Sequence, residues 1–315
     1  MNAIELHSVS KRFDEHLAVD GISLEVKRGE MFALVGPDGA GKTTTIRMLC
    51  GIVQPTSGTL SVCGFDVQKQ PAEVKKRIGY LSQKFSLYGD LSVDENIEFF
   101  AEIHNVRDYD QLRNELLEFT RLTAFRDRLA EKLSGGMKQK LALACTLIHT
   151  PEVIFLDEPT AGVDPVSRRD FWKILSGLLK EGITILMTTP YLDEAERCSR
   201  VALMNEGKIL MADTPQNLKE TVKGTTVEIV CAEIRKSFTL LKSLDVVREV
   251  HAFGDRLNVL VRNKDRDITK VLALLKTNSI EVFDWRAISP SLENVFISLL
   301  SQRRAQQESE VTPKP

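Results

Sequence analysis

The chain of 315 residues is long enough for more than one domain. Hydrophobic residues make up 43% and charged residues 27%, which are the proportions of an ordinary globular protein. Lysine and arginine total 42 and aspartate and glutamate total 44, so the formal net charge of −2 excludes a global attraction to nucleic acid or anionic lipid and leaves only a local basic patch open.

Predicted strands and helices alternate over the first two thirds of the chain. We expect strands at 4–8, 21–26 and 31–35, a helix at 41–49, a strand at 58–62, helices at 93–104, 110–122 and 136–149, a strand at 153–156, a helix at 167–180, a strand at 183–188, a helix at 191–198, and a hairpin of strands 201–204 and 208–211. This order predicts an α/β fold around a mostly parallel sheet, interrupted by a helical insertion at about 84–149.

The pattern restarts at about residue 215. Strands are predicted at 226–231, 247–252, 256–261 and 280–287, and helices at 233–244 and 267–277. We therefore expect a first domain over residues 1–215, a small C-terminal α+β domain over 216–300, and a polar tail over 301–315 that is disordered.

Membrane segments and metal-binding cysteine pairs are not predicted. Apolar runs stay well short of the roughly 20 residues that span a bilayer, and the start of the chain is acidic at Glu5 and has no signal-peptide core. We therefore expect a cytoplasmic protein, with any membrane-spanning work done by a separate subunit.

The scattered cysteines favour buried free thiols over a metal site or a disulfide framework; they are Cys50, Cys63, Cys145, Cys198 and Cys231.

The strongest motif is a glycine-rich loop that matches G-x-x-x-x-G-K-[ST] between a predicted strand and a predicted helix. Such a loop turns its backbone amides toward a phosphate at a helix N-terminus, where the dipole favours anions. Lys42 is expected to reach the β- and γ-phosphates of a nucleotide, and the hydroxyl of Thr43 to ligate Mg²⁺. A glycine-rich turn that matches by chance is the alternative. The loop and the helix start comprise Gly36, Pro37, Asp38, Gly39, Ala40, Gly41, Lys42, Thr43 and Thr44.

Two acidic residues follow the apolar strand at 153–156. Asp157 is placed on the magnesium side of a phosphate pocket, and Glu158 follows where a carboxylate can polarise water for in-line attack. An apolar strand that ends in two acids is weak support alone, but its position after a phosphate loop makes it strong.

A second glycine-containing helix start lies at Ser134, Gly135 and Gly136, within Leu-Ser-Gly-Gly-Met-Lys-Gln. It offers a further set of exposed amides and a serine hydroxyl at a positive helix end. An ordinary capped helix start is the alternative for this segment taken alone.

In this order and spacing, the three elements resemble the ATP-binding subunits of ABC transporters over about residues 3–215. The resemblance implies a P-loop NTPase core of the ABC type that binds and hydrolyses ATP with Mg²⁺. It also implies that two such domains meet head to tail, so that Ser134, Gly135 and Gly136 serve a nucleotide held mainly by the other domain. The second domain is either a copy of this chain or a different chain.

The family also assigns roles to residues outside these motifs. Gln83 matches a glutamine that joins the core to the helical insertion and senses Mg²⁺ and water, so Thr43, Gln83 and Asp157 become the expected magnesium ligands, and Lys42, Gln83 and Glu158 the expected catalytic residues. Phe13 matches an aromatic that stacks on adenine, with a core phenylalanine as the alternative. Asp164 matches a loop that reports across the dimer.

The stretch 84–96 corresponds to part of the groove that receives a short helix of the membrane subunit. Phe85, Leu87 and Tyr88 are then exposed apolar anchors, with packing inside the helical insertion as the alternative. The resemblance thus implies a membrane-spanning permease subunit as partner, a location at the cytoplasmic face of the membrane, and no nucleic acid. The motifs look most similar to the drug-exporter branch of the family.

Two positions depart from the family pattern. Asp38 stands where asparagine is more frequent, and we derive no consequence from it. Pro190 stands where the family usually has a histidine that hydrogen-bonds the γ-phosphate, and proline has neither a side-chain donor nor a backbone N–H. Thr188, Thr189 or a water is the alternative donor. We therefore expect the chain's own site to be slow rather than inactive.

Three functions are compatible with these residues. The first is the motor of an exporter, acting on drugs or other lipophilic molecules. The second is a soluble ABC ATPase that acts on ribosomes or in DNA repair, although such proteins usually carry two cassettes or a long coiled-coil insertion. The third is a regulatory nucleotide-binding module with little turnover, which Pro190 supports and Glu158 opposes.

Overall fold

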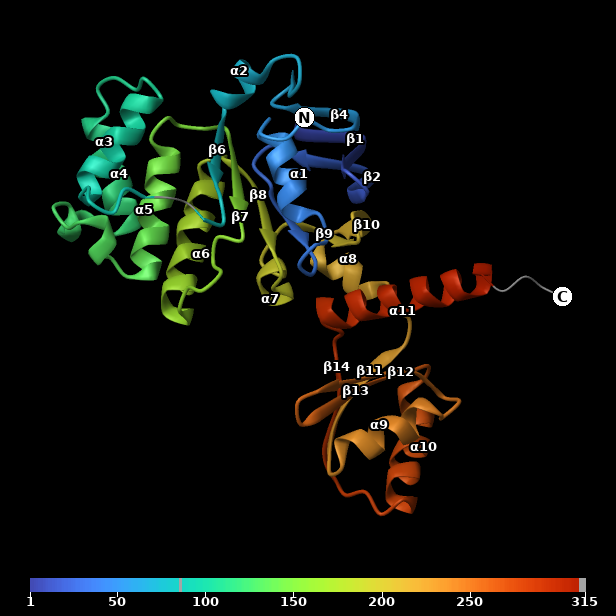
Figure 1. Ribbon diagram of the computed structural model, residues 1–315. Helices are drawn as coiled ribbons and strands as arrows, with labels where there is room; N and C mark the ends of the chain where they lie inside the picture. Colours follow the sequence, from blue (N-terminus) through green and yellow to red (C-terminus); the bar gives the residue numbers. More distant parts are fainter. Residues whose placement is uncertain (85–86, 312–315) are drawn as a thin grey trace. The chain divides into compact units, whose positions relative to one another are not determined.

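The computed structural model describes residues 1–84 and 87–311 (Figure 1). The chain consists of two compact units, residues 1–212 and residues 213–315, a division that lies next to the boundary expected at residue 215.

A parallel sheet forms the centre of the first unit. Its strand order is β10 (Lys208–Asp213), β9 (Arg200–Asn205), β3 (Met31–Val35), β8 (Thr184–Thr189), β7 (Val153–Asp157) and β6 (Ile78–Leu81). The strands from β9 to β6 pair in parallel, and their carboxyl ends meet at one edge of the sheet. Apart from Asp157 at the end of β7, the buried strands β3, β7 and β8 consist of apolar residues and threonine, as strands covered on both faces do.

A second, antiparallel sheet belongs to the same unit. Its order is β2 (His16–Lys27), β1 (Asn2–Phe13), β4 (Ser57–Val62) and β5 (Phe65–Asp66). Apolar residues of β1 and β3 share one hydrophobic core with Ile46, Met48 and Leu49 of helix α1 (Lys42–Leu49). This core fixes the start of α1 at the carboxyl end of β3.

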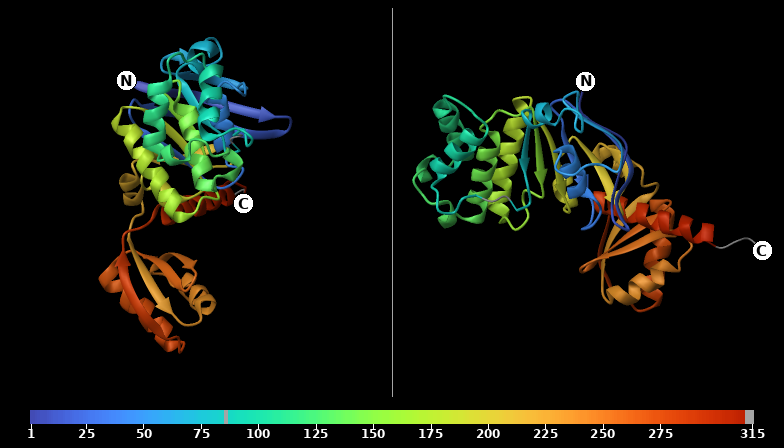
Figure 2. Two further views of the ribbon diagram at one scale, coloured as in Figure 1. Left: turned by 90° about the vertical axis from the view of Figure 1, so that its left-hand side faces the viewer. Right: turned by 45° about the horizontal axis from the view of Figure 1, so that its top comes forward.

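The helical insertion lies beside β6 at one edge of the parallel sheet. Helix α5 (Gly135–Leu147) packs against β6, and α3 (Val93–Ile103) and α4 (Asp110–Thr120) pack against α5. Helix α3 begins with a reciprocal cap, because Ser92 Oγ accepts from Glu95 N while the Glu95 side chain accepts from Ser92 N. The right-hand view of Figure 2 shows these helices and the antiparallel strands on opposite sides of the parallel sheet. Short 3₁₀ turns at Thr123–Phe125 and Ala130–Lys132 lead into α5.

Several elements of the first unit differ from the sequence prediction. Strands β1 and β2 are both longer than expected. Strands β5 and β6 and helix α2 (Pro71–Lys75) were not predicted. Strand β6 is short and contains Gly79, where an added Cβ would lie 2.6 Å from Thr146 Cγ2, so this glycine reflects close packing on α5 rather than a break. The helix expected at 191–198 is only α7 (Leu192–Ala195), because Ser199 N donates to Met31 O and the chain enters β9 beside β3.

The second unit is an antiparallel sheet with helices packed on it. Alternate residues Val227 and Ile229 of β11 (Thr225–Cys231) form a separate core with Leu241 of α9 (Ile234–Lys242) and Val271 of α10 (Lys264–Thr277). The strand order is β12 (Val247–Phe253), β13 (Arg256–Val261), β11 (Thr225–Cys231) and β14 (Val282–Ile288), and the helices are α8 (Pro215–Glu220), α9 (Ile234–Lys242), α10 (Lys264–Thr277) and α11 (Leu292–Val311).

The tail expected to be disordered from residue 301 is instead helical as far as Val311, as the end of α11, and residues 312–315 lie outside the described residues. Glutamine, arginine, alanine and glutamate fill much of this stretch and are strong helix formers, so its polarity does not argue against a helix.

The cysteines are free thiols, as predicted. Cys50, Cys145, Cys198 and Cys231 are buried, and Cys63 is half-buried. Burial raises the pKa of Cys198 to about 12 and, with help from the nearby Glu152 carboxylate, that of Cys63 to about 11. Within residues 1–84 and 87–311, no group of three or more histidine, cysteine, aspartate and glutamate side chains could hold a metal ion, and none of the helices has the length and apolarity to cross a bilayer.

Candidate nucleotide site

The glycine-rich loop connects the end of β3 to the start of α1. A Cβ at Gly36 would clash with the carbonyl oxygen of Met204, and a Cβ at Gly41 with the carbonyl oxygen of Ala18. Gly41 also has φ = +99°, a conformation that favours glycine. The loop therefore needs glycine at both positions in order to turn tightly into α1.

A cavity of about 490 Å³ opens over this loop. Phe13 lines it and is 44% exposed, so the alternative of a core phenylalanine is wrong. His16 and Ala18 of β2 also line it, although no sequence motif marks them. The described lining residues are Phe13, His16, Ala18, Asp38, Gly39, Ala40, Gly41, Lys42, Thr43, Thr44, Gln83 and Glu158. The loop, the aromatic of β1 and all three expected catalytic residues, Lys42, Gln83 and Glu158, are thus brought together.

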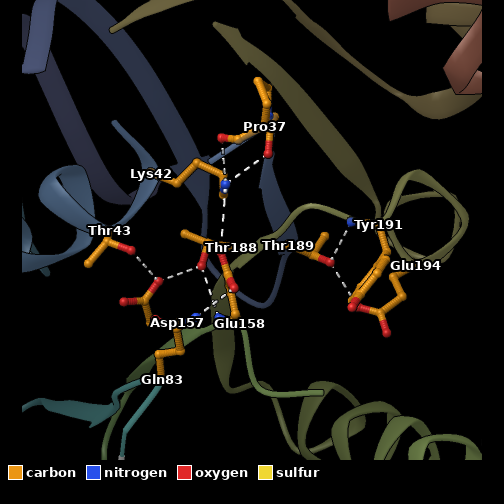
Figure 3. A network of polar contacts seen from close by, with 11 residues as sticks. Pro37, Lys42, Thr43, Gln83, Asp157, Glu158, Thr188, Thr189, Tyr191 and Glu194 are labelled. Carbon is orange, nitrogen blue, oxygen red and sulfur yellow. Dashed lines mark hydrogen bonds and ion pairs between the residues drawn. The ribbon is translucent and has the colours of Figure 1, made fainter. Parts of the chain in front are cut away.

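Lys42 is almost completely buried, with 4% of its side chain exposed. Its Nζ donates to the carbonyl oxygens of Gly36 at 2.8 Å and Pro37 at 3.0 Å, and lies 3.6 Å from Glu158 Oε1 (Figure 3). The loop carbonyls and one carboxylate therefore hold the ammonium group inside the turn, where a bound phosphate would lie.

The carboxylate of Asp157 is held at the end of β7 by two hydroxyl groups. Oδ1 accepts from Thr43 Oγ1 at 2.9 Å and from Thr188 Oγ1 at 2.6 Å. Oδ2 is buried and has no hydrogen-bond partner within the part of the chain that the structure describes. Burying a carboxylate oxygen without a hydrogen-bond partner costs free energy. A cation bound to this oxygen would offset that cost.

Glu158 follows directly and is fixed at both its backbone and its side chain. Its backbone has φ = +49°, an uncommon value for a residue other than glycine. Its N–H donates to Thr188 Oγ1 at 3.0 Å, and its Oε2 accepts from Gln83 Nε2 at 2.9 Å. Thr188 of β8 therefore organises both acidic residues. Sequence motifs do not reveal this role, because it depends on β8 pairing with β7.

The segment Ser134–Gly136 is not part of this cavity among the described residues. Ser134 caps α5, with Oγ accepting from Met137 N at 3.3 Å. An added Cβ on Gly135 would meet open space, whereas one on Gly136 would clash with the Ser167 side chain at the start of α6 (Pro165–Lys180). Among the described residues, the segment therefore contributes nothing to the lining of the chain's own cavity.

Asp164 is exposed and caps α6. Its Oδ1 accepts from Val166 N at 3.1 Å and Ser167 N at 3.0 Å. Hydrogen bonds from Ser167, first of all from its side chain, lower the pKa of the Asp164 carboxyl. The loop before α6 is therefore held by a charged cap.

Pro190 is half-buried at the bend after β8. The two threonines before it already use their hydroxyl protons, because Thr188 Oγ1 donates to Asp157 and Thr189 Oγ1 donates to Glu194 Oε2 at 2.9 Å. A threonine hydroxyl has one proton to donate. In this arrangement, neither threonine has a donor left to replace the histidine that the family usually carries.

The groove expected at 84–96 is described in part. Phe85 lies outside the described residues, Leu87 is half-buried, and Tyr88 is 45% exposed with its ring 4.4 Å from that of Phe99. Asn96, completely buried, fixes the loop by accepting from Tyr88 N at 3.0 Å and donating to Tyr88 O at 3.0 Å.

Known proteins are similar to this chain in sequence and in fold. The sequence pattern of the ABC transporter family matches residues 19–161. The daunorubicin resistance ATP-binding protein DrrA2 of Streptomyces coeruleorubidus is 36% identical over 314 residues, with 98% of each chain covered. The probable multidrug ABC transporter ATP-binding protein YbhF of Escherichia coli (strain K12) is 42% identical over 218 residues, which cover 69% of this chain but only 38% of YbhF.

A solved structure extends the similarity to the fold. The ADP conformation of MJ1267, an ATP-binding cassette of an ABC transporter, matches with a TM-score of 0.65 at 26% identity, covering 70% of this chain and 94% of that one. Together with the phosphate loop and the acidic strand, these similarities show that the chain belongs to the family of ABC transporter ATP-binding proteins.

Proposed function

We propose that this chain binds ATP with Mg²⁺ in the cavity over the phosphate loop, hydrolyses it together with a second cassette, and so powers export by a membrane-spanning subunit. The observation that carries this proposal is that Lys42 and Glu158 meet at the cavity, while Asp157 accepts a hydrogen bond from Thr43, which lines the same cavity. A phosphate-binding cation, a metal-binding carboxylate and a water-polarising carboxylate are the groups that phosphoryl transfer needs.

Lys42 and the loop amides are the proposed phosphate ligands. The described partners of the Lys42 ammonium are two carbonyl oxygens and Glu158, so this group can donate to the β- and γ-phosphates without leaving the turn. The N-terminus of α1 adds its amides and its dipole at the same place. Phe13, exposed at the cavity, is the proposed surface for the adenine ring.

The residues beside Asp157 fit a magnesium ion. The buried Oδ2 of Asp157 has no hydrogen-bond partner in the described chain, and the hydroxyl of Thr43 donates to Oδ1 of the same carboxylate. Gln83 donates through Nε2 to Glu158, which leaves its carbonyl oxygen for a ligand. Hydroxyl, carboxylate and amide oxygens are the donors that Mg²⁺ takes. When bound, the metal would neutralise charge that develops on the β- and γ-phosphate oxygens.

Glu158 is the proposed base for the attacking water. The bonds from Gln83 to its side chain and from its own N–H to Thr188 fix the carboxylate in one orientation. A carboxylate held this way can accept a proton from a water in line with the γ-phosphate. Gln83 would position this base and read the presence of metal and water.

A second cassette completes the site in this proposal. Ser134, Gly135 and Gly136 do not line the chain's own cavity among the described residues, and Ser134 and Gly135 are exposed, so this helix start is available to a nucleotide on another cassette. Asp164, exposed before α6, lies on the loop that would report across that dimer. Both a homodimer and a heterodimer satisfy this arrangement.

The proposed membrane partner would contact the helical insertion. Ile52 and Ile103 are 59% and 55% exposed, and Ile52 and Phe100 line a second cavity of about 260 Å³ beside β6 and α5. Exposed apolar side chains of this kind suit a docked helix. The chain would then lie at the cytoplasmic face of the membrane. One relative is named as a probable multidrug transporter protein and another for daunorubicin resistance, which supports a drug or another lipophilic molecule as the substrate.

A weakly active regulatory module is the second candidate. Pro190 has no donor, and the hydroxyls of Thr188 and Thr189 already donate to other groups, so fewer donors remain for the γ-phosphate.

The test of the proposed export function compares host cells that carry the wild-type chain with cells that carry Lys42→Ala. We expect the variant cells to accumulate a lipophilic dye and the complex to lose ATP hydrolysis, since the cation on the phosphates is removed. Unchanged dye export, with hydrolysis within about twofold of wild type, contradicts the proposal.

A further inference from the structure

Glu194 is a buried carboxylate outside the nucleotide cavity. It lies in the short helix α7 and is 1% exposed. Its Oε1 accepts from Thr160 Oγ1 at 2.6 Å, and its Oε2 accepts from Thr189 Oγ1 at 2.9 Å. Arg168 Nε lies 3.4 Å from Oε1 and neutralises the charge. A buried carboxylate is stable only with hydrogen-bonding and charged partners of this kind, and these three partners hold Glu194 in its buried position.

The three partners come from three different segments of the first unit. Thr160 lies in the turn after β7, close behind Asp157 and Glu158. Thr189 ends β8 and comes directly before Pro190, and Arg168 lies in the first turns of α6. Glu194 therefore connects the acidic strand, the strand that carries Thr188, and the helix that Asp164 caps. Figure 3 shows Thr189, Tyr191 and Glu194 beside the network around Asp157.

Contacts of the residues next to Pro190, and not of Pro190 itself, hold this loop in place. Tyr191 N donates to Thr189 Oγ1 at 3.0 Å, and the Arg168 guanidinium lies 4.9 Å from the centre of the Tyr191 ring. Proline contributes no donor. The position of residue 190 relative to the acidic pair thus depends on Thr189, Tyr191 and their contacts with Glu194 and Arg168.

The start of α6 also contacts the segment Ser134–Gly136, which would serve another cassette. An added Cβ on Gly136 would clash with Ser167, the residue before Arg168. The first turn of α6 thus contacts the start of α5 on one side and, through Arg168, Glu194 on the other. A displacement of Gly136 or Asp164 by a second cassette would be passed to Glu194 through rigid, packed elements.

We propose that Glu194 is a positioning residue that couples the loop at 160–164 to the end of β8, so that contact with the second cassette sets the geometry of Glu158 and of residue 190. This inference rests on the proposed ATP hydrolysis. Because Glu194 does not line the cavity among the described residues, it affects turnover and leaves the binding of ATP to one chain unchanged.

The first test replaces Glu194 with glutamine in the full-length chain. Glu194→Gln keeps the size of the side chain but removes its charge and one of its two acceptor oxygens. We expect turnover at saturating ATP and Mg²⁺ to fall about tenfold, the loss expected for weakened hydrogen bonds to a charged group. The dissociation constant for ATP should stay within about twofold. Asp193→Asn, on the same helix but exposed, is the matched control and should keep wild-type turnover.

The second test measures coupling between the two hydroxyl partners. Thr160→Val and Thr189→Val are made singly and together, in the wild-type chain and in Glu194→Gln, and turnover is measured for each. If Glu194 joins the two segments, the losses are not additive in the wild-type background and become additive in Glu194→Gln. The wild-type half of this cycle remains decisive if Glu194→Gln does not fold.

Three results overturn the inference. The first is wild-type turnover in Glu194→Gln, and the second is additive losses in the wild-type background. The third is a loss of ATP affinity as large as the loss of turnover, which marks a residue that only maintains the fold. All three presuppose a wild-type chain that hydrolyses ATP. A wild-type chain that neither binds nor hydrolyses ATP contradicts the proposed function, and the inference with it.

Discussion

Replacing Pro190 with histidine tests whether this position limits the rate. The alternative donors are already engaged, because Thr188 donates to Asp157 and Thr189 donates to Glu194. A histidine at 190 would add one donor toward the γ-phosphate. A hydrogen bond to a charged group contributes about 1.5–3 kcal/mol, which corresponds to roughly tenfold to a hundredfold in rate if the bond forms only in the transition state.

We therefore expect Pro190→His to raise turnover of the homodimer by that factor at saturating ATP, measured as phosphate release. Pro190→Ala is the matched control, since it restores the backbone N–H without adding a side-chain donor. Equal thermal midpoints and equal ATP affinities would show that both variants fold and bind. A histidine variant no faster than the alanine variant would refute the idea that the missing donor limits hydrolysis.

Three further predictions follow from other features. Glu158→Gln should retain ATP and accumulate as a closed dimer in size-exclusion chromatography with ATP and Mg²⁺, because it loses the base but keeps its shape; normal hydrolysis would show that Glu158 is not the base. A chain truncated after Thr214 should still bind ATP, because the first unit has its own core; complete loss of binding by a folded truncated chain would contradict this. Burial lowers the pKa of His149, so the folded state resists protonation, and its stability should fall as pH drops below the unfolded value of about 6.5. His149→Gln, which can still donate to Ile78 O, should reduce the fall in thermal midpoint between about pH 7.5 and 5.5, and an unchanged slope would exclude His149 as the cause.

The phosphate loop and the acidic strand could be predicted because the residues of each are contiguous. A run such as 36–43 must place its glycines, lysine and threonine at one helix start, and the structure has α1 beginning at Lys42. The alternating order of strands and helices likewise predicted the parallel sheet. The assignment of these residues to ATP stays a proposal that the variants above can test.

Contacts between distant segments could not be predicted in this way. Thr188 holds Asp157 only because β8 pairs with β7, and Glu194 reaches Thr160 across 34 positions of the sequence. Strand β6 was missed because four residues with a glycine have too little periodicity, and α11 because its composition is polar rather than amphipathic. For Thr188 and Glu194 the deciding interaction is tertiary, whereas the helical end of α11 follows from the helix propensity of its residues.

The state of the cysteines has a practical consequence for measuring motion in this protein. A thiol reacts through its thiolate, and burial raises the pKa of Cys50, Cys63, Cys145 and Cys198, so little thiolate forms at neutral pH. A single cysteine introduced at an exposed site such as Asp193 should therefore react with a maleimide fluorophore well before the native thiols. The natural chain can thus serve as its own background for distance measurements between two cassettes during ATP turnover, with its packed interior left unaltered.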